Sequence, residues 1–295
     1  MGKVELKKVE LKNGEVIGYR EGGEGKTILL VHGNMVSSRH WGELLERLAD
    51  DYHVVAVDLR GAGVSSYNRP IETFRDFAED IKLLCDELNL RDFLLIGWSM
   101  GGGISQRFVA DYQGYANSLM LYESIPCSGY SYHKKGPNGE FLPECYQNKE
   151  ELLQDRIQLK PMIDALENNN RAFIKYLWDQ LVFNVVKPSD EEYEKLLDDI
   201  FMTRNLRDAA WAAHSFNISH MYNGVTQGSG EVDNIAIPVR IFAGDRDLIV
   251  PSNLAYFTAK EIGDNAEVVI LNGCGHTPHY DNIELVLQKI KEFYR

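Results

Sequence analysis

A serine between glycines is the first residue in the chain whose surroundings indicate chemistry. It lies in GWSMG, residues 97–101, where an aliphatic run ends and a helical pattern begins. The pattern G-x-S-x-G between a strand and a helix holds the serine in a strained turn that exposes its hydroxyl. The partial positive charge of the following helix N-terminus, together with the Met100 backbone N–H, can stabilise an oxyanion. Ser99 is therefore the candidate nucleophile.

A second segment, HGNM at residues 32–35, directly follows the first strong apolar run. Here the chain leaves the carboxyl edge of the predicted sheet, where ligands collect in open α/β folds. We expect the backbone N–H of Asn34 or Met35 to be the other oxyanion donor. His32 is interpreted as a core histidine with satisfied ring nitrogens.

A carboxylate that could support a catalytic histidine lies in AGDRDLIVP, residues 243–251. An acid at the end of a late strand can orient an imidazole and stabilise its cation. Asp245 and Asp247 both qualify by residue type, and pairing with Arg246 is an alternative for either of them.

The candidate base lies in GCGHTPH, residues 273–279, a glycine-rich loop after the last predicted strand. Histidine is the general base whose proton affinity suits neutral pH, which favours His276. His279 is interpreted as a surface or metal-bound histidine. No third His, Cys or Glu lies at a zinc-ligand spacing, so we predict no metal site.

Short apolar runs alternate with amphipathic stretches, which predicts an α/β fold with a mostly parallel central sheet covered by helices on both faces. An N-terminal strand pair turns at Asn13-Gly14. The predicted buried strands are 27–32, 53–58, 93–97, 118–123, 239–244 and 266–271, and the predicted core helices are 41–50, 73–88, 102–112 and 283–294.

The alternation stops after residue 125. Residues 126–144 are rich in Pro, Gly, Ser and Tyr and predict a loop, whereas about 146–222 has helical spacing without a convincing strand. We therefore predict a core domain of residues 1–125 and 231–295, interrupted by a helical lid of residues 126–230.

The composition excludes several classes of function. A net charge of −13 over 295 residues argues against nucleic-acid binding and against electrostatic attachment to anionic membranes. No apolar run is long enough to span a bilayer. The four cysteines form no Cys-x-x-Cys pair and indicate no disulfide framework, so we expect a cytoplasmic protein. We also expect it to be a monomer or a homodimer.

These features follow the Ser…Asp…His order of α/β-hydrolases, and the sequence resembles that superfamily in the branch with a helical lid. The matching segments are LLVHGN (29–34), DLRGAGVSS (58–66), GWSMGG (97–102), AGDRDLIVP (243–251) and GCGH (273–276).

The resemblance implies Ser99 as nucleophile, His276 as base and Asp247 as acid. Asp247 is favoured over Asp245 because the family's acid comes three residues after the glycine, here Gly244, and before a hydrophobic-Pro step. Glu123 is the alternative acid, since some members place it after that earlier strand. The implied activity is that of a serine hydrolase, and it needs no cofactor.

The substrate is expected to contact aromatic side chains of the helical lid and of the strand–helix turn at residues 97–101, the nucleophile elbow. An enclosed, largely apolar pocket favours a small to medium hydrophobic ester, lactone or thioester. The predicted substrate-binding residues are Trp98, Trp178, Trp211, Phe183 and His214.

Two other functions remain open from the sequence. One retains the same three residues but hydrolyses a carbon–carbon bond in dienoic ring-cleavage products, or has an organic-acid-dependent haloperoxidase side activity. The other is a ligand receptor on a hydrolase scaffold with slow turnover. The measured turnover rate separates an enzyme from a receptor.

Overall fold

A single mixed sheet forms the centre of the molecule. The computed structural model of the chain describes residues 4–136 and 138–295. Eight strands lie in the order β1-β2-β4-β3-β5-β6-β9-β10, in which the β1–β2 and β2–β4 pairs are antiparallel and the others parallel. The strands are β1 (Glu5–Glu10), β2 (Val16–Gly22), β3 (Thr27–Val31), β4 (His53–Val57), β5 (Phe93–Trp98), β6 (Ala116–Tyr122), β9 (Val239–Gly244) and β10 (Ala266–Leu271).

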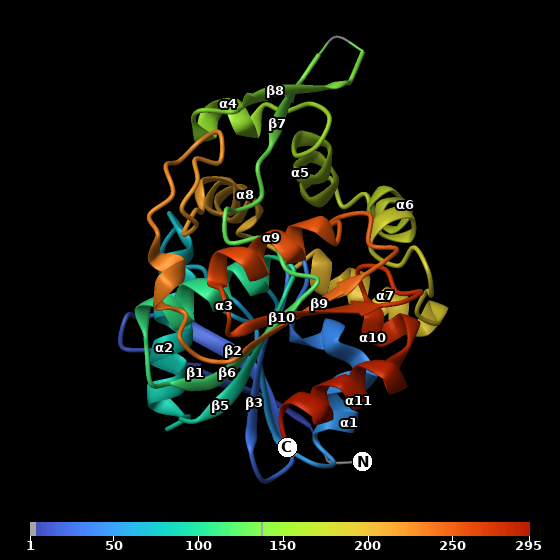
Figure 1. Cartoon of the computed structure of the whole chain (residues 1–295). Coiled ribbons are helices and arrows are strands. Elements are labelled where there is room, and N and C mark those ends of the chain that lie inside the picture. The colour runs from blue at the N-terminus through green and yellow to red at the C-terminus, as the bar shows by residue number, and fades with distance from the viewer. Residues whose placement is uncertain (1–3, 137) are drawn as a thin grey trace.

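Helices cover both faces of this sheet (Figure 1). Helices α2 (Phe74–Glu87), α3 (Met100–Asp111) and α9 (Asn253–Ile262) pack on one face, whereas α1 (Gly42–Leu48) and α11 (Ile283–Phe293) pack on the other. Because successive side chains of a strand point to opposite faces, the central strands supply both cores and are apolar throughout. The predicted α/β-hydrolase architecture is confirmed.

The chain between β6 and β9 forms a group of helices above the sheet (Figure 1). It contains α4 (Lys149–Leu153), α5 (Lys160–Glu167), α6 (Arg171–Leu181), α7 (Asp190–Ile200) and α8 (Leu206–Ser215). Ser189 caps α7 by accepting a hydrogen bond from the Glu192 N–H. The lid boundaries at residues 126 and 230 stay a prediction.

A short hairpin lies where the sequence predicts only a loop. Strands β7 (His133–Lys135) and β8 (Phe141–Cys145) pair antiparallel and project beyond α4 and α5 (Figure 1). Pro143 within β8 weakens the strand signal, because proline cannot donate to a ladder. It is tolerated because a two-stranded ribbon leaves one edge of each strand unpaired.

The remaining elements are short. They are the 3-10 turns η1 (Ser38–Trp41) and η2 (Glu231–Asn234) and the one-turn helix α10 (Pro278–Asp281). All four cysteines are buried and unpaired. Within residues 4–136 and 138–295, no helix has the length and hydrophobicity required to cross a membrane.

Candidate active site

Ser99 occupies the turn between β5 and α3 in a left-handed backbone conformation, with φ 55° and ψ −122°. Such a conformation is strained for a residue with a side chain, and it persists only where the surroundings enforce it. A Cβ at Gly101 would overlap the carbonyl oxygens of Val31 and His32, and one at Gly97 would overlap the Ser105 hydroxyl. Both glycines of the motif are thus required, because the chain on either side of Ser99 packs too closely against its neighbours to leave room for a side chain.

The expected oxyanion donors gather beside this serine. Met100 is the first residue of α3, and the first N–H groups of a helix have no intrahelical acceptor. Asn34 and Met35 line the same cavity as Ser99, and Met35 has a positive φ of 56°. His32 behaves as predicted, since its Nε2 accepts from the Leu59 N–H at 3.0 Å and its Nδ1 donates to the Gly33 carbonyl at 2.8 Å.

His276 is held by Asp247. Its Nδ1 donates to Oδ2 of Asp247 at 2.7 Å, and both residues are buried. The other carboxylate oxygen accepts the backbone N–H groups of Ile249 and Val250 at 2.7 and 3.0 Å. Burial alone would raise the pKa of Asp247, but His276 and these backbone donors outweigh it and hold that pKa below its ordinary value.

The other two candidate acids form hydrogen bonds with backbone groups and not with His276. Asp245 is exposed, and it accepts the Gly273 N–H at 2.7 Å. Glu123 is buried at the end of β6, and its carboxyl oxygens lie 2.9 and 2.8 Å from the Gly244 nitrogen. Of the three acids, Asp247 is the one hydrogen-bonded to His276 among the described residues.

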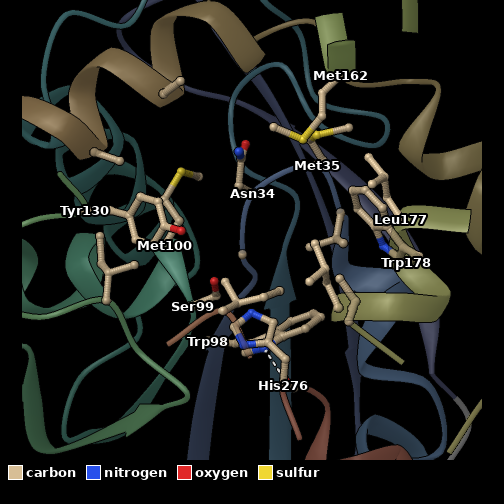
Figure 2. A pocket seen from close by; sticks show the side chains of 18 of the residues that line it. Asn34, Met35, Trp98, Ser99, Met100, Tyr130, Met162, Leu177, Trp178 and His276 are labelled. Carbon is tan, nitrogen blue, oxygen red and sulfur yellow. Dashed lines mark hydrogen bonds between the residues drawn. The ribbon is translucent and has the colours of Figure 1, made fainter. Parts of the chain in front are cut away.

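Trp98 anchors the loop that carries His276. Its Nε1 donates to the His276 carbonyl at 2.9 Å, and the two rings lie 5.8 Å apart between centroids (Figure 2). This bond links the end of β5, next to the nucleophile, to the loop after β10. The residue before Ser99 therefore helps to fix the position of the candidate base.

These groups face one cavity of about 240 Å³ between the sheet edge and the lid. Figure 2 shows Ser99 and His276 at its base, Tyr130 and Met100 on one side, and Leu177 and Trp178 on the other. Most of the wall is apolar. The lining residues are Gly33, Asn34, Met35, Val36, Trp98, Ser99, Met100, Ile125, Tyr130, Tyr132, Met162, Leu177, Trp178, Leu181, Val182, Ala210, Ala213, Leu248, Ile249 and His276.

Of the predicted substrate-binding residues, Trp98 and Trp178 line this cavity, and Trp211, Phe183 and His214 are not among its lining residues. Phe183 is fully buried, with its ring centroid 5.4 Å from Tyr193 and 5.1 Å from Tyr280. Nδ1 of His214 accepts the Tyr132 N–H, and its Nε2 donates to the Tyr146 carbonyl. Trp211 packs edge-on against His214.

Several lining residues were missed from the sequence. Leu177 and Leu181 both lie on α6, and Leu181 is three residues after the predicted Trp178, so helical spacing could have identified Leu181 and, four residues before it, Leu177. Tyr130 comes from the predicted loop after β6, where composition gives no signal for which tyrosine faces inward.

His279 is neither exposed nor metal-bound, so its predicted environment was wrong. It is buried, its Nε2 donates to the His40 carbonyl at 2.9 Å, and its Nδ1 accepts the Tyr122 hydroxyl at 3.1 Å. Burial lowers the pKa of His279 to about 4, which keeps the ring neutral. No three His, Cys, Asp or Glu side chains of the described chain are grouped to bind a metal ion.

The sheet, the elbow and the buried acid–histidine pair define an α/β-hydrolase. A family model described as "Alpha/beta hydrolase family" matches residues 28–289, and the chain belongs to this family.

Similar sequences carry several activities in their names. The chain is 25% identical over 273 residues to non-heme chloroperoxidase CPO-A1 of Kitasatospora aureofaciens, covering 90% of each protein. It is 22% identical over 292 residues to proline iminopeptidase PfmaB of Pestalotiopsis fici, covering 95% of this chain and 96% of that protein.

Solved structures agree on the fold. A bromoperoxidase from Bacillus anthracis superposes with a TM-score of 0.75 at 21% identity, covering 98% of this chain and 99% of the other. The esterase RhEst1 from Rhodococcus sp. gives 0.70 at 22% identity, with 98% of each chain covered.

Proposed function

We propose that this protein is a serine hydrolase that cleaves a carboxylic ester, lactone or thioester of a small to medium hydrophobic substrate. The observation that carries the proposal is the 2.7 Å hydrogen bond between Asp247 and His276 at the base of a cavity that Ser99 also lines. Esterases among the structural neighbours support the same reaction class.

In the proposed cycle, Nε2 of His276 takes the proton of Ser99 as Oγ attacks the substrate carbonyl carbon. The oxyanion of the tetrahedral intermediate accepts hydrogen bonds from the backbone N–H of Met100 and that of Asn34 or Met35. His276 then gives its proton to the leaving alcohol or thiol, and an acyl-enzyme remains. Water, deprotonated by His276, attacks the acyl carbon and releases the acid, and Ser99 regains its proton.

The cavity wall limits the substrate. Among the residues that line the cavity there is no Asp, Glu, Lys or Arg, so a charged acyl group would be desolvated without a partner. Oδ1 of Asn34 is buried and has no hydrogen-bond partner in the described chain. Because an unpaired buried acceptor is unfavourable, a substrate hydroxyl or amide N–H beside Asn34 would be stabilising. We therefore expect neutral substrates, favoured when they carry such a donor.

The opening of the cavity is also apolar. Leu181 and Leu248 line the cavity although their side chains are exposed, at 39% and 62%. They therefore lie where the cavity meets solvent. A substrate chain longer than the cavity would pass between these two leucines and remove their apolar surface from water.

A second candidate reaction uses the same acyl-enzyme, and the similarity to a named chloroperoxidase favours it. Hydrogen peroxide in place of water would attack the acyl carbon, giving a peroxyacid and free Ser99. The peroxyacid would then oxidise a halide ion and return to the carboxylic acid. Carbon–carbon hydrolysis is less favoured, because no arginine lines the cavity to hold a diketone acid.

The test is a hydrolysis panel of p-nitrophenyl esters of graded chain length, lactones, a thioester and a dienoic diketone, with and without hydrogen peroxide and bromide. We expect ester or lactone turnover of roughly 1–10³ s⁻¹ for an enzyme and far slower turnover for a receptor. Ser99→Ala should abolish both turnover and covalent labelling by an organophosphate. Full labelling of this variant would contradict the nucleophile assignment.

A further inference from the structure

A second acid lies buried behind the candidate catalytic acid. Glu123 directly follows β6 with a φ of 45°, and the residue is 1% exposed. Both of its carboxyl oxygens lie within 2.9 Å of one backbone donor, the Gly244 N–H. Within the described residues, no basic side chain forms an ion pair with it. Glu123 thus lacks the partners that ordinarily stabilise a buried carboxylate.

The neighbour of Glu123 is Asp247. Tyr122 of β6 pairs with Phe242 of β9, and Glu123 accepts the N–H of Gly244, which lies three residues before Asp247. The two carboxyl groups therefore interact directly. Two carboxyl groups in contact cannot both be ionised without strong repulsion, so one of them must hold a proton. Asp247 accepts three hydrogen bonds, from His276, Ile249 and Val250, which stabilise its charged form. Glu123 accepts from a single N–H. This difference assigns the shared proton to Glu123.

We propose that Glu123 is a positioning residue that remains protonated at neutral pH and donates its O–H to Asp247. The donated bond holds the Asp247 carboxylate in line with Nδ1 of His276. This inference rests on the proposed Ser99–His276–Asp247 mechanism, and it adds a residue that does not itself touch the substrate.

The titratable groups around Glu123 favour its neutral form, whereas the Gly244 N–H favours its charged form. The titratable groups facing it are Tyr122 in β6, Asp247 after β9, Cys274 after β10 and Asp281 in α10. None of these can become a cation. Burial raises the pKa of Glu123 well above its ordinary value, and the charge of Asp247 raises it further.

A neutral Glu123 has a consequence for catalysis. One carboxylate beside His276 stabilises the imidazolium that forms in the reaction. A second negative charge would stabilise that cation in the resting enzyme as well as in the reaction. Less of the enzyme would then hold a free base at neutral pH. The proton on Glu123 limits the site to a single negative charge.

The decisive variant is Glu123→Gln, which replaces the O–H donor by an N–H donor of similar shape. We expect its kcat/KM to stay within about threefold of the wild type, and the midpoint of the acid limb of the pH profile to move by less than about 0.3 units. If Glu123 were ionised in the wild type, removing its charge would lower that midpoint by about one unit. Such a shift would overturn the proposal.

Glu123→Leu removes the donor and retains bulk. We expect a loss of kcat/KM of about tenfold or more and an acid limb displaced to higher pH, because Asp247 becomes the stronger base. Lower stability with an unchanged midpoint would indicate a merely structural role and would contradict the proposal. Glu15→Gln, at a buried carboxyl that accepts backbone N–H groups of Asn68 and Arg69, is the matched control and should leave the midpoint unchanged.

Infrared spectroscopy tests the proton directly and needs no substrate. The difference spectrum of wild type minus Glu123→Gln at pH 7 should contain the C=O stretch of a protonated carboxyl, and its absence would refute the proposal. If the wild type hydrolyses nothing in the panel, the proposed function fails, while the infrared result still decides the state of Glu123.

Discussion

Oδ2 of Asp247 lies 2.7 Å from Nδ1 of His276, and both side chains are almost completely withdrawn from solvent. The bond occupies Nδ1 and leaves Nε2 as the ring nitrogen available to Ser99. It also fixes the imidazole tautomer, because the carboxylate can only accept. Asp245, two positions earlier, is exposed and accepts an N–H from the loop before His276.

Replacing each aspartate by asparagine should show which of Asp245 and Asp247 is the catalytic acid. Asp247→Asn is expected to lower kcat by about 10³–10⁴, since an amide favours the wrong tautomer of His276. Asp245→Asn should lower it by less than about threefold, because it removes an exposed charge and retains an oxygen that can accept the Gly273 N–H. Steady-state kinetics on the best ester measures both variants. A greater loss for Asp245→Asn would reverse the assignment.

The indole bond of Trp98 should contribute to stability and to the placement of His276. Trp98→Phe removes the N–H donor to the His276 carbonyl, with an expected loss of about 1 kcal/mol in the free energy of unfolding.

Trp41→Phe is the control for this variant. Trp41 is equally buried and packs against Trp98, and its Nε1 has no hydrogen-bond partner among the described residues. Urea unfolding of both variants isolates the contribution of the hydrogen bond. Equal destabilisation by the two changes would show that the bond adds nothing.

The cavity opening should select for chain length. Leu248→Glu places a charge where a long acyl chain leaves the cavity, so the kcat/KM ratio of p-nitrophenyl octanoate to acetate should fall by about tenfold. Tyr256→Glu, at an exposed apolar residue outside the cavity lining, should leave the ratio unchanged. An unaltered ratio in both variants would argue against an exit beside Leu248.

The Asn34 side chain should affect substrate choice. Asn34→Ala removes the unpartnered Oδ1 but keeps the backbone N–H, so the preference for a hydroxylated ester over its plain analogue should fall by about fivefold to tenfold. The ratio of the two kcat/KM values measures this preference independently of overall activity. A parallel loss for both esters would assign Asn34 no role in recognising the hydroxyl.

The buried His279 should make the fold sensitive to acid. Its pKa is about 4 in the folded protein and about 6.5 in an unfolded chain, so between these values only the unfolded chain binds the proton. Stability is therefore present above about pH 6.5 and is lost as the pH falls toward 4.

His279→Gln should reduce this loss, because glutamine can pair with the Tyr122 hydroxyl and the His40 carbonyl without titrating. Relative to the wild type, its free energy of unfolding should rise by on the order of 1 kcal/mol per pH unit between pH 6 and 5. Denaturant unfolding at several pH values measures this difference. Parallel stability curves would mean that another group dominates.

Local patterns in the sequence were sufficient to predict the nucleophile turn, the central strands and the family of this protein. The elbow at Ser99 was predictable because a strained turn needs small neighbours, and Gly97 and Gly101 can be read directly from the sequence. The central strands were predictable because burial on both faces makes them continuously apolar. The order of the serine, the acid and the histidine then identified the family.

Tertiary structure decided which side chains meet. The family resemblance already favoured Asp247 over Asp245, and the structure adds the reason: the turn after β9 directs Asp247 to His276 and Asp245 to the Gly273 N–H. Phe183 packs between Tyr193 of the lid and Tyr280 of α10, whereas Leu177 faces the cavity, because the orientation of each lid helix on the core sets which side points inward.

The contact between Glu123 and Asp247 is also one that only the tertiary structure decides. It exists because β6 and β9 are neighbours in the sheet although a whole lid separates them in the chain. The sequence by itself determined the family and the candidate nucleophile, since that residue and its turn are local. The walls of the cavity and the second buried acid beside Asp247 were decided by packing between distant segments.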